Sequence, residues 1–308
     1  MKKTQHEGQP GQWLIILAGI CWGLIGLFSN YLADSGLNPV RITFLRSSVA
    51  AAGLWIYLGI FHREDLKIRL RDFWMFIGTG VCSIVFFNIM YFITIERTTL
   101  SVAAILLYTA PCFVMLMSAA VFHEKITGMK MVALLLALFG CGCTTGIFEG
   151  GAAGIPLIGI LTGIGSGIGY ALYTIFGNVA LKKSPPTTVT AYTFLVASLS
   201  LLPFVQVTGM SPVLRQGDVP LFILAIGLIS TLLPFALYTT GLKTTEPGKA
   251  SVMAFVEPMV ATLVSIFILK EGFRWMEMFG VAAIFVSIVL LNLPEKAAVK
   301  AGKTVSER

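Results

Sequence analysis

Ten long apolar runs set the strongest constraint on how this chain folds. Each run is long enough to cross roughly 30 Å of hydrocarbon as a helix. Because a bilayer core supplies no hydrogen-bonding partners, only helices and closed barrels can span it, and runs of this length indicate helices. The composition agrees, since charged residues make up only 12% of the chain. The sequence therefore predicts an all-α membrane protein with ten transmembrane helices, at about residues 13–32, 38–60, 73–95, 99–122, 127–147, 155–181, 187–208, 219–242, 248–269 and 274–293.

Two stretches of the chain are weak copies of each other. Residues 80–131 and 227–278 align without gaps at a spacing of 147. In each copy, a proline within an apolar run is followed thirteen residues later by a glutamate, first Glu124 and then Glu271. This pattern is typical of transporters built from two structural repeats. The identical pairs are Gly80/Gly227, Ser83/Ser230, Tyr91/Tyr238, Thr98/Thr245, Ala103/Ala250, Pro111/Pro258, Leu116/Leu263, Ser118/Ser265, Glu124/Glu271, Met129/Met276 and Met131/Met278.

The duplication predicts two five-helix repeats, residues 13–147 and 155–293, flanked by tails at 1–12 and 294–308. Since five is an odd number, the second repeat must enter the membrane from the opposite side. The two repeats are then inverted copies, related by a two-fold axis in the membrane plane. Two such repeats that exchange conformations open a pathway to each side in turn, which is the geometry of alternating access.

The positive charges lie mainly on one side of the predicted bundle. With ten crossings, sixteen Lys and Arg residues fall on the side of the N-terminus, and Arg41 and Arg46 fall within the second run. This bias predicts that both termini are cytoplasmic. It also accounts for the net charge of +7 without nucleic acid, because the basic loops lack the interleaved aromatic residues that stack on bases. The opposite side carries only Arg97, Arg215, Lys270 and Arg274.

Several other functions lack the residues that they need. His123 and Glu124 are not followed by the second histidine of a metalloprotease motif, and no nucleotide-binding loop occurs. The five cysteines all lie within apolar runs, where buried thiols behave as small hydrophobes. We therefore expect no catalytic site, no cofactor and no metal. A receptor or scaffold stays open as an alternative, although the chain has no sizeable soluble domain through which to signal.

Four short motifs, taken in order, resemble those of a known family. They are Trp22-Gly23, Phe44-Leu45-Arg46, Tyr108-Thr109-Ala110-Pro111 followed by Glu124, and Glu257-Pro258 followed by Glu271. With the paired repeats, they make residues 13–293 similar to the EamA-type transporters of the drug/metabolite transporter superfamily. The resemblance implies a ten-helix bundle in a bacterial inner membrane, commonly one that exports amino acids or related small metabolites. It implies no particular substrate, because relatives carry chemically different cargo.

Two charges within the apolar runs are the first candidates for a substrate-binding site. Glu257 lies near the centre of the ninth run, where a charge is costly and normally faces the bundle interior or a water-filled cavity. The functional interpretation is a carboxylate that binds a proton or a substrate amine. The structural alternative is a carboxylate held by Arg46 or by hydroxyls of a neighbouring helix. Arg46 in turn either pairs with such a carboxylate or receives a substrate carboxylate as a hydrogen-bonding fork. Ala110 stands at the repeat position of Glu257, so the two repeats are chemically unequal.

Aromatic and amide side chains complete the predicted substrate-binding site. Their rings can stack on an apolar part of a substrate while a hydroxyl, indole or amide group offers a hydrogen bond. The alternative for Tyr91 and Tyr238, which lie near the ends of their runs, is a place in the interfacial aromatic belt. The candidates, chosen by their place in the runs and by three-residue spacing on a helix face, are Trp22, Asn88, Tyr108, Tyr170, Tyr173 and Tyr238.

These observations together predict a secondary transporter whose pathway runs between the two repeats. We expect the first, third, fourth, sixth, eighth and ninth runs to line the pathway, and Ile284 in the last run to face lipid. The expected partners are a small-molecule substrate, membrane lipid and, if Glu257 titrates, protons. The alternative is a carrier of nucleotide sugars or phosphorylated metabolites, although such cargo favours more positive charge than Arg46 alone supplies. The oligomeric state is left open.

Overall fold

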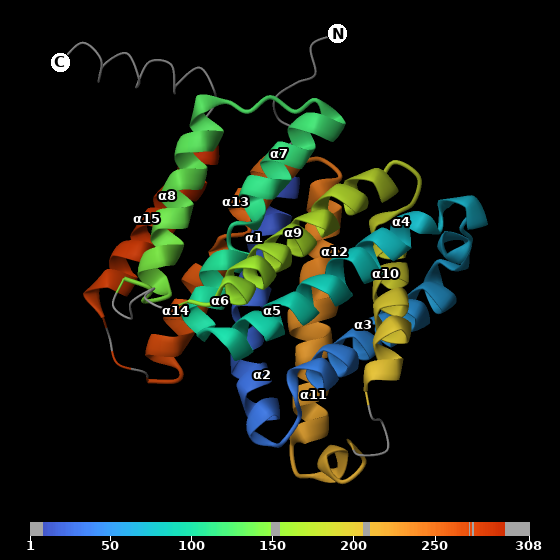
Figure 1. Cartoon of the computed structure of the whole chain (residues 1–308). Coiled ribbons are helices and arrows are strands. Elements are labelled where there is room, and N and C mark those ends of the chain that lie inside the picture. Colours follow the sequence, from blue (N-terminus) through green and yellow to red (C-terminus); the bar gives the residue numbers. More distant parts are fainter. Residues whose placement is uncertain (1–8, 149–154, 206–209, 271, 273, 293–308) are drawn as a thin grey trace, which may run out of the picture.

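Every regular element that the structure describes is helical, and the helices pack side by side as a bundle (Figure 1). Most of the two expected tails, 1–12 and 294–308, lies outside the described part, as does Glu271. The computed structural model describes residues 9–148, 155–205, 210–270, 272 and 274–292.

The helices follow the apolar runs, and several runs are divided into two or three pieces. The first repeat contains α1 (Gln9–Gly23), α2 (Ile25–Asp34), α3 (Pro39–Phe61), α4 (Trp74–Ile77), η3 (Gly78–Val85), α5 (Phe86–Arg97), α6 (Leu100–Leu107), α7 (Ala110–Phe122) and α8 (Gly128–Thr144). The second repeat contains α9 (Leu157–Ala180), α10 (Pro186–Leu201), α11 (Val219–Gly227), η7 (Leu228–Leu232), α12 (Leu233–Leu242), α13 (Pro247–Met253), α14 (Val256–Phe267) and α15 (Trp275–Asn292).

Nine helical stretches in the described part of the chain are long and apolar enough to cross a membrane. The remaining crossing, α8, is an apolar helix of 17 residues and is shorter than the expected run 127–147. It pairs with α15 in antiparallel fashion, because Ser287 donates to the Ala133 carbonyl at 2.8 Å while Gly140 lies against Gly280 further along. The expected all-α fold with two five-helix repeats is therefore confirmed.

The duplication is visible in the irregularities of the helices. The third and eighth crossings each contain a π-helical segment, η3 and η7, and these end at Val85 and Leu232, which are 147 residues apart. The fourth and ninth crossings are each broken within the four residues before a proline, because proline lacks the N–H that would continue the helical hydrogen bonds. The second and seventh crossings both begin at a proline, Pro39 and Pro186, at the same spacing. Interruptions at matching positions show that both repeats share one backbone plan.

Each repeat inserts its first helix into the other repeat. Helix α1 packs against α12 and α14 of the second repeat, and α9 packs against α5 and α7 of the first. Two further pairs of equivalent helices, α3 with α10 and α8 with α15, also join the repeats. Small residues permit the close crossings. At Gly23, for example, an added methyl group would lie only 2.8 Å from the Glu257 carbonyl oxygen, which is too close for a normal contact. Both ends of the described chain lie on one face of the bundle, which we call the terminal face (Figure 1).

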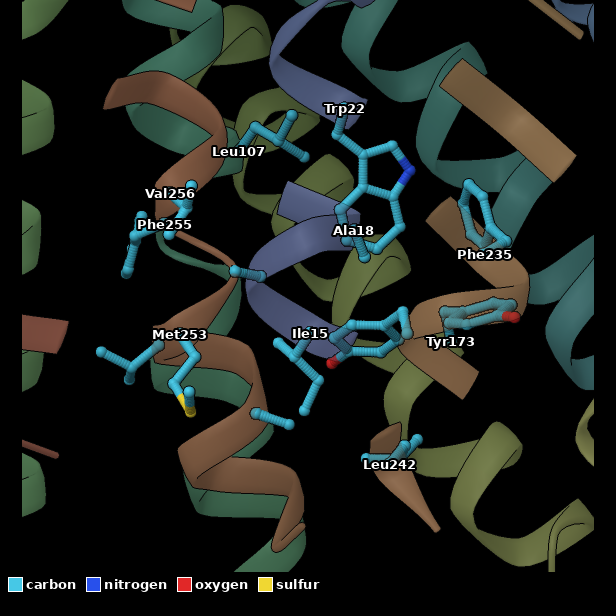
Figure 2. Packing of buried hydrophobic residues seen from close by; sticks show 14 of the residues in the cluster. Ile15, Ala18, Trp22, Leu107, Tyr173, Phe235, Leu242, Met253, Phe255 and Val256 are labelled. Atoms are coloured by element: carbon cyan, nitrogen blue, oxygen red, sulfur yellow. The ribbon is translucent and has the colours of Figure 1, made fainter. Parts of the chain in front are cut away.

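The main core lies where α1, α9, α12 and α13 meet (Figure 2). Ile15, Tyr173 and Met253 are buried there, each from a different helix. Ile284 is also fully buried, against Gly140 in the seam between α8 and α15. The expectation that Ile284 faces lipid is therefore wrong, because its side of α15 is the one that packs against α8.

Candidate functional site

An aromatic cavity lies between the two repeats. The Trp22 ring of α1 is 5.1 Å from the Phe235 ring and 5.3 Å from the Tyr238 ring, both on α12. Tyr173 of α9 approaches Phe235 edge-on at 4.9 Å (Figure 2). The volume of the cavity in this conformation is only about 10 Å³, close to what a single water molecule needs, so the rings are closed around it. Its lining residues are Trp22, Ser83, Ile84, Phe87, Tyr170, Tyr173, Thr174, Phe235 and Tyr238.

Two reciprocal hydrogen bonds hold the tyrosines of this aromatic cavity. The Tyr173 hydroxyl pairs with Thr239 at 2.7 Å, and the Tyr238 hydroxyl pairs with Thr174 at 2.8 Å. Each tyrosine is thus joined to a threonine on the opposite helix, α9 or α12. Because Tyr238 is almost fully buried, it belongs to the bundle interior and not to the interfacial belt. Buried hydroxyls that are paired in this way fix the orientation of the rings.

A second cavity lies between the two helix breaks. From the first repeat it is lined by the break between α6 and α7, and from the second by the break between α13 and α14. Glu257 stands in the first turn of α14 with part of its surface exposed, and it lines this cavity. The Tyr170 hydroxyl lies within hydrogen-bonding reach of the Glu257 carboxylate, and Tyr170 lines both cavities. The other lining residues are Leu107, Tyr108, Ala110, Pro111, Ser251, Ala254 and Phe255.

A polar cluster beside the cavities holds Arg46. The guanidinium group of Arg46 is buried, and its Nη2 lies 3.5 Å from the Asn88 side-chain oxygen. That oxygen also accepts from Thr43 at 3.3 Å, while the Asn88 amide donates to the Ile84 carbonyl at 2.7 Å. Asn88 therefore ties α3 to α5, one turn from a residue that lines the aromatic cavity.

The charges of Arg46 and Glu257 attract each other without a direct contact. Arg46 lies close enough to Glu257 for their charges to attract, yet no direct ion pair joins them in the described part of the chain. The direct pairing considered from the sequence is therefore not what holds Arg46. A guanidinium group carries five N–H donors, and the hydrogen bond to Asn88 is the one that the described residues supply. The remaining donors suit a second acceptor such as a carboxylate.

The repeats differ chemically where the site lies. At the spacing of 147, Arg46 corresponds to Thr193, Asn88 to Phe235, and Glu257 to Ala110. The first repeat thus contributes the cation and the amide, and the second contributes the carboxylate. A pair of otherwise equivalent helix breaks therefore encloses an electrically asymmetric space.

The structure brings together the eight predicted site residues. Trp22, Tyr173 and Tyr238 line the aromatic cavity, and Tyr108 and Glu257 line the second cavity. Tyr170 joins the two, whereas Arg46 and Asn88 lie in the adjacent polar cluster. All six crossings expected to line a pathway contribute to the cavities. No group of three or more potential metal ligands occurs among the described residues.

Sequence reasoning missed the apolar and small members of the site. Phe235 and Phe255 lie among 22 phenylalanines that are distributed over the whole chain, so nothing marked them. Ser83 had a usable signal, because it is identical in the two repeats and lies in an irregular helical segment. Ser251 had none.

Comparisons with known proteins give a consistent result. A family model described as the EamA-like transporter family matches residues 9–146 and 157–293. An uncharacterized transporter of Archaeoglobus fulgidus is 27% identical over 287 residues, which covers 91% of this chain and 95% of the relative. The inner membrane transporter YicL of Salmonella typhimurium is 23% identical, with 95% and 98% covered. A crystal structure with 17% identity superposes with a TM-score of 0.79 over 92% of this chain and 96% of the other, which supports the fold alone.

Proposed function

Because this chain belongs to the EamA-like transporter family, we propose that it is a secondary transporter that exports amino acids or related small metabolites by alternating access. Family membership and the apolar crossings make it a multi-pass membrane transporter. The proposal concerns the class of substrate, the transport mechanism and the direction of transport.

Two adjoining sites carry this proposal: the second cavity, which lies at the helix breaks, and the aromatic cavity beside it. An amino acid presents an ammonium group, a carboxylate and a side chain within a few bond lengths. Glu257 offers an acceptor for the ammonium group, and Arg46 offers donors for the carboxylate. The aromatic cavity, which Tyr170 joins to the second cavity, offers a surface for an apolar side chain. One anion and one cation beside an apolar cavity suit a small zwitterion.

Cross-packing of the repeats supports alternating access. In this structure α1 and α9 contact equivalent helices of the opposite repeat, so a small difference between the repeats decides which side is open. We propose residues 13–147 and 155–293 as the two units that exchange conformations. The π-helical segments η3 and η7 and the breaks at Pro111 and Pro258 supply matching places for bending.

Glu257 is the proposed site of proton coupling. A low-dielectric cavity disfavours the charged form of a carboxylate, so the carboxylate there binds a proton more readily than an exposed one does. Arg46 opposes protonation, and Tyr170 and Tyr108 face the same cavity. Tyr91 and Cys141 also lie within range of its charge. Binding of a substrate ammonium group would release the proton, which links cargo movement to a pH gradient.

The charge bias supports an orientation with both termini in the cytoplasm of the cell, in its inner membrane. The loop between α7 and α8 lies at the terminal face (Figure 1), and this loop and the first turn of α8 carry Lys125 and Lys130. The terminal face is then the cytoplasmic face.

The charge of the cavities also bears on the alternative functions. Nucleotide sugars and phosphorylated metabolites carry one or more negative phosphates, and Arg46 is the cation that the described residues place beside the cavities. Glu257 would repel such cargo. A receptor or scaffold has no need for a carboxylate that lines a cavity near a buried guanidinium group between two repeats.

A transport assay on purified protein in liposomes tests the proposal. The panel contains amino acids of different side-chain classes, analogues that lack the amino or the carboxyl group, and a nucleotide sugar, each with and without an imposed pH gradient. We expect gradient-dependent movement of at least one amino acid, with analogues that lack either charged group competing poorly. Movement of the nucleotide sugar alone, or no movement of any amino acid, contradicts the proposal.

A further inference from the structure

A compact ionic cluster joins the two repeats at the terminal face. Lys130, in the first turn of α8, places its ammonium group 2.6 Å from Glu124 and 2.6 Å from Glu246. Glu124 and Lys130 belong to the first repeat, whereas Glu246 belongs to the second and directly precedes α13. The cluster therefore spans the boundary between the units proposed to move.

The two cluster residues of the first repeat are built into the bundle, whereas Glu246 lies at its surface. The side chains of Glu124 and Lys130 are 7% and 11% exposed. Glu124 also accepts a hydrogen bond from the backbone N–H of Gly248 at 3.1 Å and another from Ser118. A methyl group at Gly248 would lie 2.8 Å from Glu124 Oε1, so a larger residue there would displace the carboxylate. Buried charges of this kind need partners, and here the second repeat supplies two of them, Glu246 and the Gly248 N–H.

The position of the cluster gives it a mechanical role. Glu246 and Gly248 lie at the start of α13, and Ser251, one turn further along, lines the second cavity beside Glu257. The cluster thus holds the start of α13, one turn from the second cavity, against the loop between α7 and α8. The repeat position of Lys130 is Glu277, which pairs with Arg274 three residues away on its own repeat.

We propose that Glu124, Lys130 and Glu246 form an ionic latch that holds the terminal face closed in this conformation, and that the latch must open for substrate to enter or leave there. The inference rests on the proposed alternating access for its purpose, but the latch itself is testable without transport. A second ion pair between the repeats on the same side, Lys183 with Asp72, is about as exposed as Lys130 with Glu246. It joins the segment before α4 to the segment after α9 and does not involve α13.

The experiment measures access to the second cavity from the terminal face. A variant without the five native cysteines carries Ser251→Cys, a nearly isosteric change. It is placed in vesicles whose outer surface bears the C-terminus, as verified by protease removal of a C-terminal tag. The rate of modification by a membrane-impermeant maleimide reports how often the terminal face opens. Lys130→Met and Glu246→Gln each remove one link of the latch. Lys125→Met removes an exposed charge from the same loop and is the matched control.

We expect Lys130→Met and Glu246→Gln to raise the modification rate about threefold or more, since a partly exposed ion pair biases a two-state equilibrium by about that factor. Lys125→Met should leave the rate unchanged. Should Lys130→Met fail to fold, Glu246→Gln still decides, because the Glu246 side chain is 63% exposed and its change leaves Lys130 paired with Glu124. Equal rates in all variants overturn the latch, as does an equal increase in Lys125→Met. A protein that transports no amino acid but shows faster modification would overturn the proposed substrate and leave the latch standing.

Discussion

Glu257 is the single residue on which the proposed transport mechanism depends most. We expect Glu257→Gln to fold normally, because glutamine keeps the size of the side chain and its hydrogen bond with Tyr170. We expect gradient-driven uptake to fall by about tenfold or more, since a hydrogen bond to a charged group contributes about 1.5–3 kcal/mol and glutamine cannot carry a proton. Uptake rates in proteoliposomes, with and without a pH gradient, measure the effect.

The matched control for Glu257 is Glu64→Gln. Glu64 lies in η1 (Arg63–Leu66), is 84% exposed and pairs with Lys67. Its substitution should leave uptake and its pH response unchanged. If Glu257→Gln transports at the original rate with an unaltered pH response, then Glu257 is structural and the proton-coupling proposal is wrong.

Charged residues marked the candidate site in the sequence better than apolar residues did. A glutamate or an arginine inside an apolar run is conspicuous, because burying a charge is costly and few are kept. Phe235 has no such mark, since phenylalanine faces lipid as readily as it lines a cavity. The absence of a direct ion pair between Arg46 and Glu257 also depends on distances between helices, which the order of residues does not contain.

The crossing of α1 with α14 is the element contact most sensitive to added volume near the site. A methyl group at Gly23 would lie 2.6 Å from Val260 Cβ and 2.8 Å from the Glu257 carbonyl. We expect Gly23→Ala to destabilise the protein by about 1–3 kcal/mol through overpacking, and to lower the Tm in detergent. Gly26→Ala, three residues on, meets no atom within 4 Å and should be neutral or slightly stabilising. An unchanged Tm in Gly23→Ala would show that α1 and α14 leave enough space for a methyl group at this crossing.

The irregular elements were only partly predictable. Pro111 and Pro258 marked the breaks in the fourth and ninth crossings, because proline cannot complete a helical ladder. The π-helical segments η3 and η7 carry no such mark, since the residues that form them are compatible with an ordinary helix. The orientation of α15 was equally hidden. Its apolar residues occur on all sides, so no periodicity separated the buried Ile284 from lipid-facing neighbours such as Phe285, which is 58% exposed.

At the scale of the whole molecule, the proposed pathway between the repeats predicts which positions substrate protects. Thiols introduced at Asn88 and Tyr173 should be modified more slowly when substrate is bound, because both positions lie at or beside the cavities. A thiol introduced at Phe285, on the outer surface of α15, should react at the same rate with or without substrate. Modification rates in a cysteine-free background provide the measurement. Equal protection at all three positions, or none at any, rejects this pathway.

The orientation of the whole molecule in the membrane is the last prediction, and it depends on charge alone. Both ends of the described chain lie on one face (Figure 1), as expected if α8 crosses the membrane together with the nine longer stretches. The excess of Lys and Arg on that side predicts that it is cytoplasmic. Lys125 is exposed on the terminal face, and Gln216 is exposed in the loop before α11 on the opposite face (Figure 1). In intact cells, an impermeant maleimide should therefore modify Gln216→Cys and spare Lys125→Cys, and inverted membrane vesicles should reverse the result. Modification of Lys125→Cys in intact cells would show that the terminal face lies outside the cell. The proposed latch would then close the outer side of the protein.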